Sequence, residues 1–161
     1  MNTTYNMKPS LNRAKRTRND EFYTRLQDID REVCLYSDFF RGKSVYCNCD
    51  DYRKSNFFKF FEGRFDEFGL KRLVATCHVP KGRGVRHEIS MDRRGGLTSL
   101  LNGNGSFSSD ECLEELDKAD VVVTNPPFSL FREFFDVLVG HKKKFLVIGN
   151  LNAIPCKNVF S

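Results

Sequence analysis

"ADVVVTNPPFSLFREFF", residues 119–135, is the stretch that decides the fold. An apolar run through Val121–Val123 leads straight into Asn-Pro-Pro-Phe at 125–128, and a second apolar, helix-like segment follows at once. Two consecutive prolines remove two backbone donors and fix two φ angles. The pattern predicts a buried strand that ends at a rigid, carbonyl-rich corner with an aromatic ring at its tip.

That corner suits chemistry on a planar nitrogen. An aromatic amine is a poor nucleophile because its lone pair is delocalised into the ring. The side-chain oxygen of Asn125 and the carbonyl of Pro126, made rigid by Pro127, are two acceptors for the amine hydrogens, and Phe128 offers a face on which a base can stack. The group attacked would be a methyl sulfonium, with catalysis by positioning and electrostatics. The structural alternative is a plain strand-to-helix turn.

Strands and helices alternate along the chain. We expect helices at about Thr24–Tyr36, within 53–65, from a capping box at Ser108 and Glu111 to Lys118, and at 129–139. We expect strands at 44–49, 70–79, 119–125 and 143–150, a weaker one at 85–92, and loops at 93–96 and 103–107. Continuous apolar strands between helices predict an α/β fold whose parallel sheet is covered on both faces.

In such a sheet, ligands bind beyond the carboxyl ends of the strands. The candidate positions are therefore those that follow each strand: 48–51, 77–78, 102–107, 125–128 and 149–150. We expect the strand containing Val121–Val123 near the middle of the sheet.

The first strand runs into "YCNCDDYRKSNFF", residues 46–58, where a glycine-rich phosphate or nucleoside loop would ordinarily stand. It contains no glycine. Asp50 and Asp51 could meet the cationic end or the ribose of a nucleoside cofactor, or could simply be acids at a helix N-terminus. Upstream, Phe22 and Tyr23 could cover a cofactor or staple the chain to the sheet, with Thr24 as a helix cap.

The six cysteines favour reduced thiols. Cys47, Cys49, Cys77 and His78 could be drawn as a zinc site, but they do not form the two ligand pairs of a structural zinc site. The chain carries no export signal, so reduced cysteines without disulfides are expected. We therefore expect small, buried thiols that hold no metal.

Charge and hydropathy restrict the setting. Residues 1–18 carry five basic residues and no acid, and the net charge of the whole chain is +5. This arm could contact phosphates or be a solvated tail. No segment approaches the ~20 apolar residues of a membrane span, and a cytoplasmic location is expected.

Five blocks resemble, in the same order, the EcoRI-type adenine-specific DNA methyltransferases. They are "NDEFYT" (19–24), "VYCNCDDYRKSNFFKFF" (45–61), "LVATCH" (73–78), "GNGSFSSDECLEELDKADVVVTNPPFSLFREFF" (103–135) and "KKFLVIGNLNAI" (143–154). The resemblance covers about residues 10–155. It implies S-adenosylmethionine as methyl donor, adenine in duplex DNA as acceptor, and a Rossmann-like, doubly wound, mostly parallel sheet.

The resemblance also assigns residues. Asn125, Pro126, Pro127 and Phe128 form the catalytic corner, and Phe22, Tyr23 and Thr24 belong to the cofactor-contacting motif ahead of the first strand. Asn48, Asp50 and Asp51 replace the glycine-rich loop. The last cofactor residue is Asn104, where the family usually has Asp; it offers an oxygen but no charge.

The resemblance ends early, because a full sheet of this kind usually has seven strands and is followed by a part that reads DNA. We therefore expect a basic arm (1–18) and a partial catalytic domain (19–161), truncated on its C-terminal side. The chain would then be a fragment, the product of a split gene whose second polypeptide supplies the rest, or the product of a decayed gene. We expect little activity from the chain alone. The alternatives are an inactive nucleic-acid-binding remnant, or a methyltransferase acting on RNA or on a protein glutamine.

Overall fold

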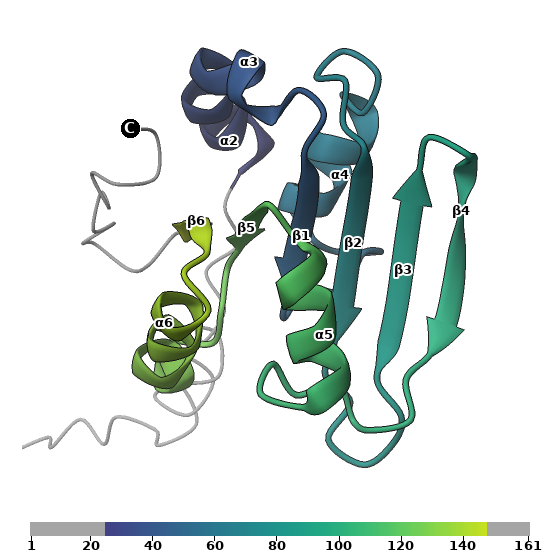
Figure 1. Cartoon of the computed structure of the whole chain (residues 1–161), viewed down its shortest axis with the longest axis vertical. Coiled ribbons are helices and arrows are strands. Elements are labelled where there is room, and N and C mark those ends of the chain that lie inside the picture. Colours follow the sequence, from purple (N-terminus) through teal and green to yellow (C-terminus); the bar gives the residue numbers. More distant parts are fainter. Residues whose placement is uncertain (1–24, 148–161) are drawn as a thin grey trace, which may run out of the picture.

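The computed structural model describes residues 25–147, which form a six-stranded sheet covered by helices (Figure 1). The strands lie in the order β4-β3-β2-β1-β5-β6. Their bounds are β1 Ser44–Asn48, β2 Arg72–Cys77, β3 Val85–Ser90, β4 Arg93–Leu100, β5 Val121–Thr124 and β6 Lys144–Val147. The predicted α/β class is confirmed.

The centre of this sheet is parallel. β1 pairs in parallel with β2 on one side and with β5 on the other, and β5 pairs in parallel with β6. Val121–Val123 therefore lie in a strand with a neighbour on each side and not at an edge. β5 is directly beside the edge strand β6, which is nearer to the edge than the predicted place near the middle of the sheet. The carboxyl ends of β1, β2, β5 and β6 all point to the same edge of the sheet.

The β3–β4 side of the sheet differs from two predictions. Residues 93–96 were expected as a loop but begin β4. The sheet was expected to be parallel, but β3 runs antiparallel to both β2 and β4. The hairpin was hidden because β4 is mostly exposed and therefore not apolar. Gly96 is required there: its φ is +74°, and a Cβ atom would come within 2.7 Å of the His87 ring.

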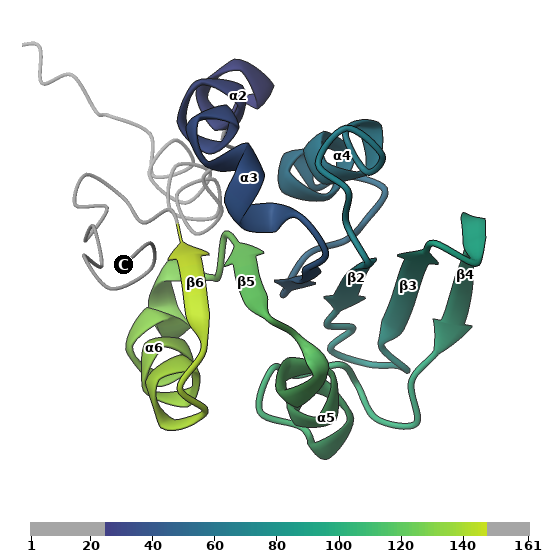
Figure 2. The same ribbon diagram turned by 45° about the horizontal axis from the view of Figure 1, so that its top comes forward.

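Helices cover both faces, as Figure 2 shows. One face carries α2 (Leu26–Val33), a 3₁₀ turn (Cys34–Tyr36), α3 (Ser37–Phe40) and α4 (Asn56–Gly63). The other carries α5 (Asp110–Lys118) and α6 (Phe131–Gly140). Alternate residues of each central strand enter opposite cores: Val45 and Cys47 pack with the α2–α4 layer, and Tyr46 packs with α5 and α6. Within residues 25–147, no helix has the length and apolarity that crossing a membrane requires.

The single helix predicted at Thr24–Tyr36 is replaced by α2, the 3₁₀ turn and α3, which together extend to Phe40. Gly42, with φ +71°, lies in the turn that follows α3. Helix α4 begins as its sequence indicates: the Ser55 hydroxyl accepts a hydrogen bond of 3.1 Å from the Phe58 N–H. Its four phenylalanines are all buried.

The predicted capping box at the start of α5 is wrong. The N-cap is Ser109, and no side chain caps the helix there. The Glu111 carboxylate instead accepts from the backbone N–H groups of Asn102 (2.9 Å) and Gly103 (2.8 Å). The reason is tertiary: the chain leaving β4 passes the first turn of α5 and brings two donors within reach of Glu111.

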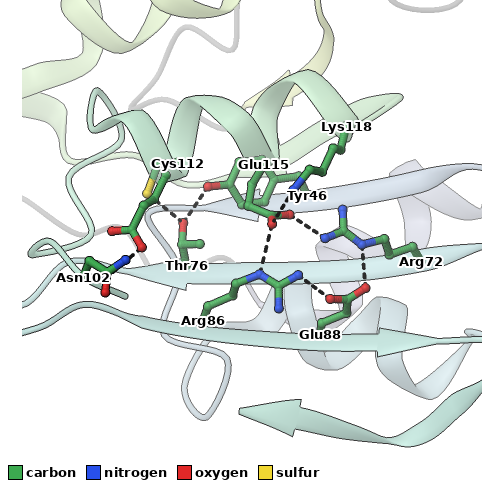
Figure 3. A network of polar contacts seen from close by, with 10 residues as sticks. Tyr46, Arg72, Thr76, Arg86, Glu88, Asn102, Cys112, Glu115 and Lys118 are labelled. Carbon is green, nitrogen blue, oxygen red and sulfur yellow. Dashed lines mark hydrogen bonds and ion pairs between the residues drawn. The ribbon is translucent and has the colours of Figure 1, made fainter. Parts of the chain in front are cut away.

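A group of four alternating charges fixes α5 to the sheet (Figure 3). This α5 charge cluster consists of Arg72, Arg86, Glu88 and Glu115. Arg72 binds Glu88 at 2.6 Å and also Glu115, while Arg86 binds Glu115 at 3.1 Å and also Glu88. Burial alone would raise the pKa of Glu115, but its hydrogen bond to Arg72 and the positive charges around it outweigh burial and lower that pKa.

Candidate functional site

A cavity of about 470 Å³ lies at the carboxyl edge of the sheet. It lies where the chain leaves β1 toward β2 on one side and leaves β5 toward α6 on the other, which is the topological switch point of the sheet. The residues that line it are Cys49, Asp50, Asp51, Lys54, Ser55, Asn56, Phe57, Cys77, His78, Pro80, Gly105, Ser106, Phe107, Asn125, Pro127 and Leu130. The structure thus brings together segments from four of the five predicted positions; 149–150 lie outside the described residues.

The turn after β1 forms one wall. Cys49 has φ +68°, the left-handed conformation that glycine adopts most easily, so the chain makes the tight turn without a glycine. Asp50 is buried, and the Thr124 hydroxyl lies 3.0 Å from its Oδ2. The same hydroxyl donates to the Asn48 carbonyl. The end of β5 and the turn after β1 are thereby held together.

Asp51 faces the cavity in an ion pair. Its carboxylate accepts from Arg53 Nε (2.9 Å) and Nη2 (3.1 Å), and these bonds lower the pKa of Asp51. The carboxylate is therefore ionised and largely neutralised by Arg53. Lys54 brings a further positive charge to the cavity lining.

Asn48, at the end of β1, is buried among polar side chains. Its Oδ1 accepts from the Thr76 hydroxyl (3.2 Å), which in turn lies 2.7 Å from the Tyr46 hydroxyl. Within residues 25–147, the buried Asn48 Nδ2 has no hydrogen-bond partner. This predicted cofactor residue is not among the residues that line the cavity, although the next residue, Cys49, is.

Asn104 does not line the cavity, although the three residues that follow it do. Its Oδ1 accepts from the Ser106 N–H (3.0 Å), and its carbonyl accepts from the Val79 N–H (2.8 Å). The lining is formed by Gly105, Ser106 and Phe107. Gly105 has φ +78°, and a Cβ there would lie 2.4 Å from the Cys77 carbonyl oxygen, so only glycine fits.

The Asn-Pro-Pro-Phe corner forms the opposite wall. Asn125 and Pro127 line the cavity, while Pro126 is buried and neither it nor Phe128 is a lining residue. Phe128 begins a short 3₁₀ turn (Phe128–Leu130) that is closed by the Leu130 N–H donating to the Pro127 carbonyl at 3.1 Å. The predicted residues Phe22, Tyr23 and Thr24, and the arm 1–18, lie outside the described residues.

The cysteines near the site have protonated thiols. Burial raises the pKa of Cys47, Cys49 and Cys77. In the described part of the chain, all five cysteines are free and no three His, Cys, Asp or Glu side chains are grouped as metal ligands. The expectation of a metal-free protein stays a prediction, which stoichiometric zinc in elemental analysis of the dialysed protein would contradict.

Several residues of the site were not predicted. They are Thr124, which bonds the turn after β1, and the lining residues Lys54, Ser55, Asn56, Phe57, Pro80 and Leu130. Thr124 could have been found, because it is a hydroxyl at the last position of an otherwise apolar strand. Lys54 and Leu130 carry no such signal. Each lies in a turn whose position over the cavity depends on packing.

The site contains charges of both signs, backbone amides and carbonyls, and the carbon faces of Phe107, Pro80 and Leu130. A sheet with such a cavity at its switch point defines a class of α/β proteins that bind a small polar ligand beyond their parallel strands.

The particular family follows from sequence comparison. The family model for the adenine-specific methyltransferase EcoRI matches residues 10–94 and 87–161, and the chain belongs to this family. The chain is 44% identical to the Type II methyltransferase M.EcoRI of Escherichia coli, over 94% of this chain and 51% of that protein. It is 45% identical to M.MpnI of Mycoplasma pneumoniae, over 93% of this chain and 46% of that protein.

A third relative, M.MgeORF184P of Mycoplasma genitalium, is 41% identical over 94% of this chain and 47% of its own length. The chain therefore spans about half the length of the curated relatives it matches. No solved structure shows a significant match.

Proposed function

We propose that this chain carries the S-adenosylmethionine site and the catalytic corner of an enzyme that methylates the exocyclic amine of adenine in DNA. One observation carries the proposal: a single cavity is lined by the acidic turn after β1, by the 105–107 loop and by the Asn125 corner. Membership of the EcoRI-type family and the Type II methyltransferase relatives support the same activity.

The residues present fit the cofactor. Asp50 suits its positive charges, Asp51 can accept from its ribose hydroxyls while paired with Arg53, and Lys54 suits its carboxylate. The Asn48 amide nitrogen is a buried donor without a described partner, close beneath the turn. Phe107 and Leu130 offer carbon surface for the adenine ring. S-adenosylmethionine supplies an electrophilic methyl group when bound.

Asn104 has a different part in this proposal. Its oxygen binds the Ser106 N–H, so it shapes the loop and leaves the cofactor contact to the loop backbone. The Asn-for-Asp departure from the family then removes a charge from the loop while keeping its turn. Phe22, Tyr23 and Thr24 complete the cofactor site in this proposal.

At the corner, the Asn125 side-chain oxygen and the Pro126 carbonyl accept hydrogen bonds from the target amine. Two acceptors favour a nitrogen whose lone pair is available for attack on the methyl group. Pro127 keeps the spacing of these acceptors rigid, and Phe128 stacks on the base turned out of the duplex. No covalent enzyme intermediate is required, since orientation and electrostatics supply the rate enhancement.

The wider proposal concerns the whole chain. The sheet is a Rossmann-like, doubly wound one, and residues 19–161 belong to a catalytic domain. The arm 1–18 contacts DNA phosphates in the cytoplasm.

Isothermal titration of the chain with S-adenosylmethionine tests the cofactor site. We expect one molecule bound per chain, weakened by Asp50→Asn and unaffected by Glu67→Gln, an exposed change outside the cavity. Absence of binding would favour the inactive nucleic-acid-binding remnant instead. Methyl incorporation into DNA, RNA and glutamine peptides, with the missing half supplied in trans, separates the substrates.

A further inference from the structure

The segment that joins β4 to the cavity wall is held by two oppositely charged side chains. Arg83, in the turn before β3, donates from Nε to the Leu101 carbonyl (2.6 Å) and from Nη2 to the Leu100 carbonyl (3.4 Å). Glu111 accepts from the next two backbone N–H groups, those of Asn102 and Gly103. In four consecutive residues, a cationic side chain thus binds the carbonyls of the first two, and an anionic side chain binds the amides of the last two. We call residues 100–103 the strap.

The strap is also hydrogen-bonded to Gly84, in the turn before β3. The Gly103 carbonyl accepts from the Gly84 N–H at 2.8 Å, and the Leu101 N–H donates to the Gly84 carbonyl, also at 2.8 Å. A Cβ on Gly84 would lie 2.6 Å from the Gly105 Cα. Gly105, Ser106 and Phe107 then line the cavity directly. A change in the strap is therefore transmitted to the wall within three residues.

We propose that Glu111 is a positioning residue for the cavity wall at 105–107, acting through the strap and without contact to the ligand. The α5 charge cluster anchors α5 to β2 and β3 (Figure 3). Glu111 lies in the first turn of this helix, so its carboxylate is presented from a fixed element. Its two backbone hydrogen bonds lower the pKa of Glu111, so the carboxylate is ionised near neutral pH, when these bonds are strongest.

Amide hydrogen exchange on the chain tests this directly. We expect Glu111→Ala to accelerate exchange of the Asn102 and Gly103 amides by about tenfold, since each loses a charge-assisted acceptor. Glu111→Gln keeps one acceptor oxygen and should restore part of the protection. Glu114→Ala is the matched control, because Glu114 is an exposed acid on the same helix, outside the cavity.

The second readout rests on the proposed function. Glu111→Ala should weaken S-adenosylmethionine binding by about tenfold, with unchanged stoichiometry and with unchanged exchange in β1, and Glu111→Gln should recover part of it. Wild-type exchange at residues 101–107 in Glu111→Ala would overturn the inference, whether or not the cofactor binds. If the wild-type chain bound no cofactor, the proposed function would fail, while the exchange result would still decide the role of Glu111.

Should Glu111→Ala unfold the chain, exchange would rise throughout β1 as well. Arg83→Ala then provides the test, because it releases the same strap from the opposite side and leaves the start of α5 intact. Faster exchange confined to 101–107 supports positioning by the charged pair. If exchange at residues 101–107 is unchanged both in Arg83→Ala and in Glu111→Gln, the inference that these side chains position the cavity wall is contradicted.

Discussion

Thr124 is the residue that joins the two sides of the candidate site. Its side chain is fully buried, and its hydroxyl reaches both the Asn48 carbonyl and the Asp50 carboxylate. Thr124→Val keeps the shape of the side chain but removes the hydroxyl that contacts both oxygens. We expect a loss of about 1–2 kcal/mol in the free energy of unfolding, measured by urea denaturation. Thr124→Ser should restore most of it; equal stability of the valine variant would show that the hydroxyl contributes nothing.

Asn125 is the residue on which the proposed chemistry depends. In an enzyme completed by its missing half, Asn125→Ala should lower the methylation rate by about a hundredfold or more, because one positioned polar group stabilises the transition state by ~3 kcal/mol. Cofactor affinity should change little, since Asn125 is proposed to face the base. Asn125→Asp keeps an oxygen and should retain partial activity. If Asn125→Ala left the rate unchanged while Asp50→Ala was inactive, residues 125–128 would have a structural role and not a catalytic one.

At the scale of elements, the α5 charge cluster decides how firmly α5 is held on the sheet (Figure 3). Glu115→Gln leaves Arg72 and Arg86 each without one ionic partner. We expect a loss of about 2 kcal/mol in the free energy of unfolding. Breaking a fully buried ion pair costs ~3–5 kcal/mol, but the side chains of Arg72 and Arg86 are partly exposed to solvent. Urea denaturation at neutral pH measures this, with Glu114→Gln as control.

The pH dependence of the same cluster has a definite sign. Glu88 and Glu115 both have lowered pKa values in the folded chain, from an ordinary value of 4.5. Their stabilisation is therefore fully present above that value and is lost as pH falls through the lowered folded values. Stability should drop on acidification below about 4.5, and more shallowly in Glu115→Gln. Identical slopes for the two proteins would remove Glu115 from the acid response.

At the scale of the whole molecule, the two cores share one sheet. Val123 belongs to the core beneath α2–α4 and Val122 to the core beneath α5 and α6, although they are neighbours in β5. Val122→Ala and Val123→Ala should each lower the unfolding free energy by about 2 kcal/mol, within a single transition. Circular dichroism and tyrosine fluorescence should report coincident midpoints.

Val139→Ala is the control for this pair, because Val139 is 53% exposed on α6. It should change stability by less than ~0.5 kcal/mol. Separate transitions for the two buried valine variants would mean that each face of the sheet unfolds by itself.

The central strands, the helices between them and the edge of the sheet where the candidate site lies all follow from the residue pattern. Those properties are local: an apolar run such as Val121–Val123 must be buried wherever it packs, and Asn-Pro-Pro must end its strand. The acidic turn and the corner could therefore be placed at strand ends from the residue pattern alone. The described structure brings them around one cavity.

Only the tertiary structure decided where exposed or polar groups find their partners. Residues 93–100 form a strand because β3 offers an edge, although their own composition is polar and glycine-containing. Glu111 could bond locally to its helix start, but the strap places two N–H groups closer. A hydrogen-bonding group is satisfied by whichever partner the packing brings within about 3 Å, and sequence spacing does not contain that distance.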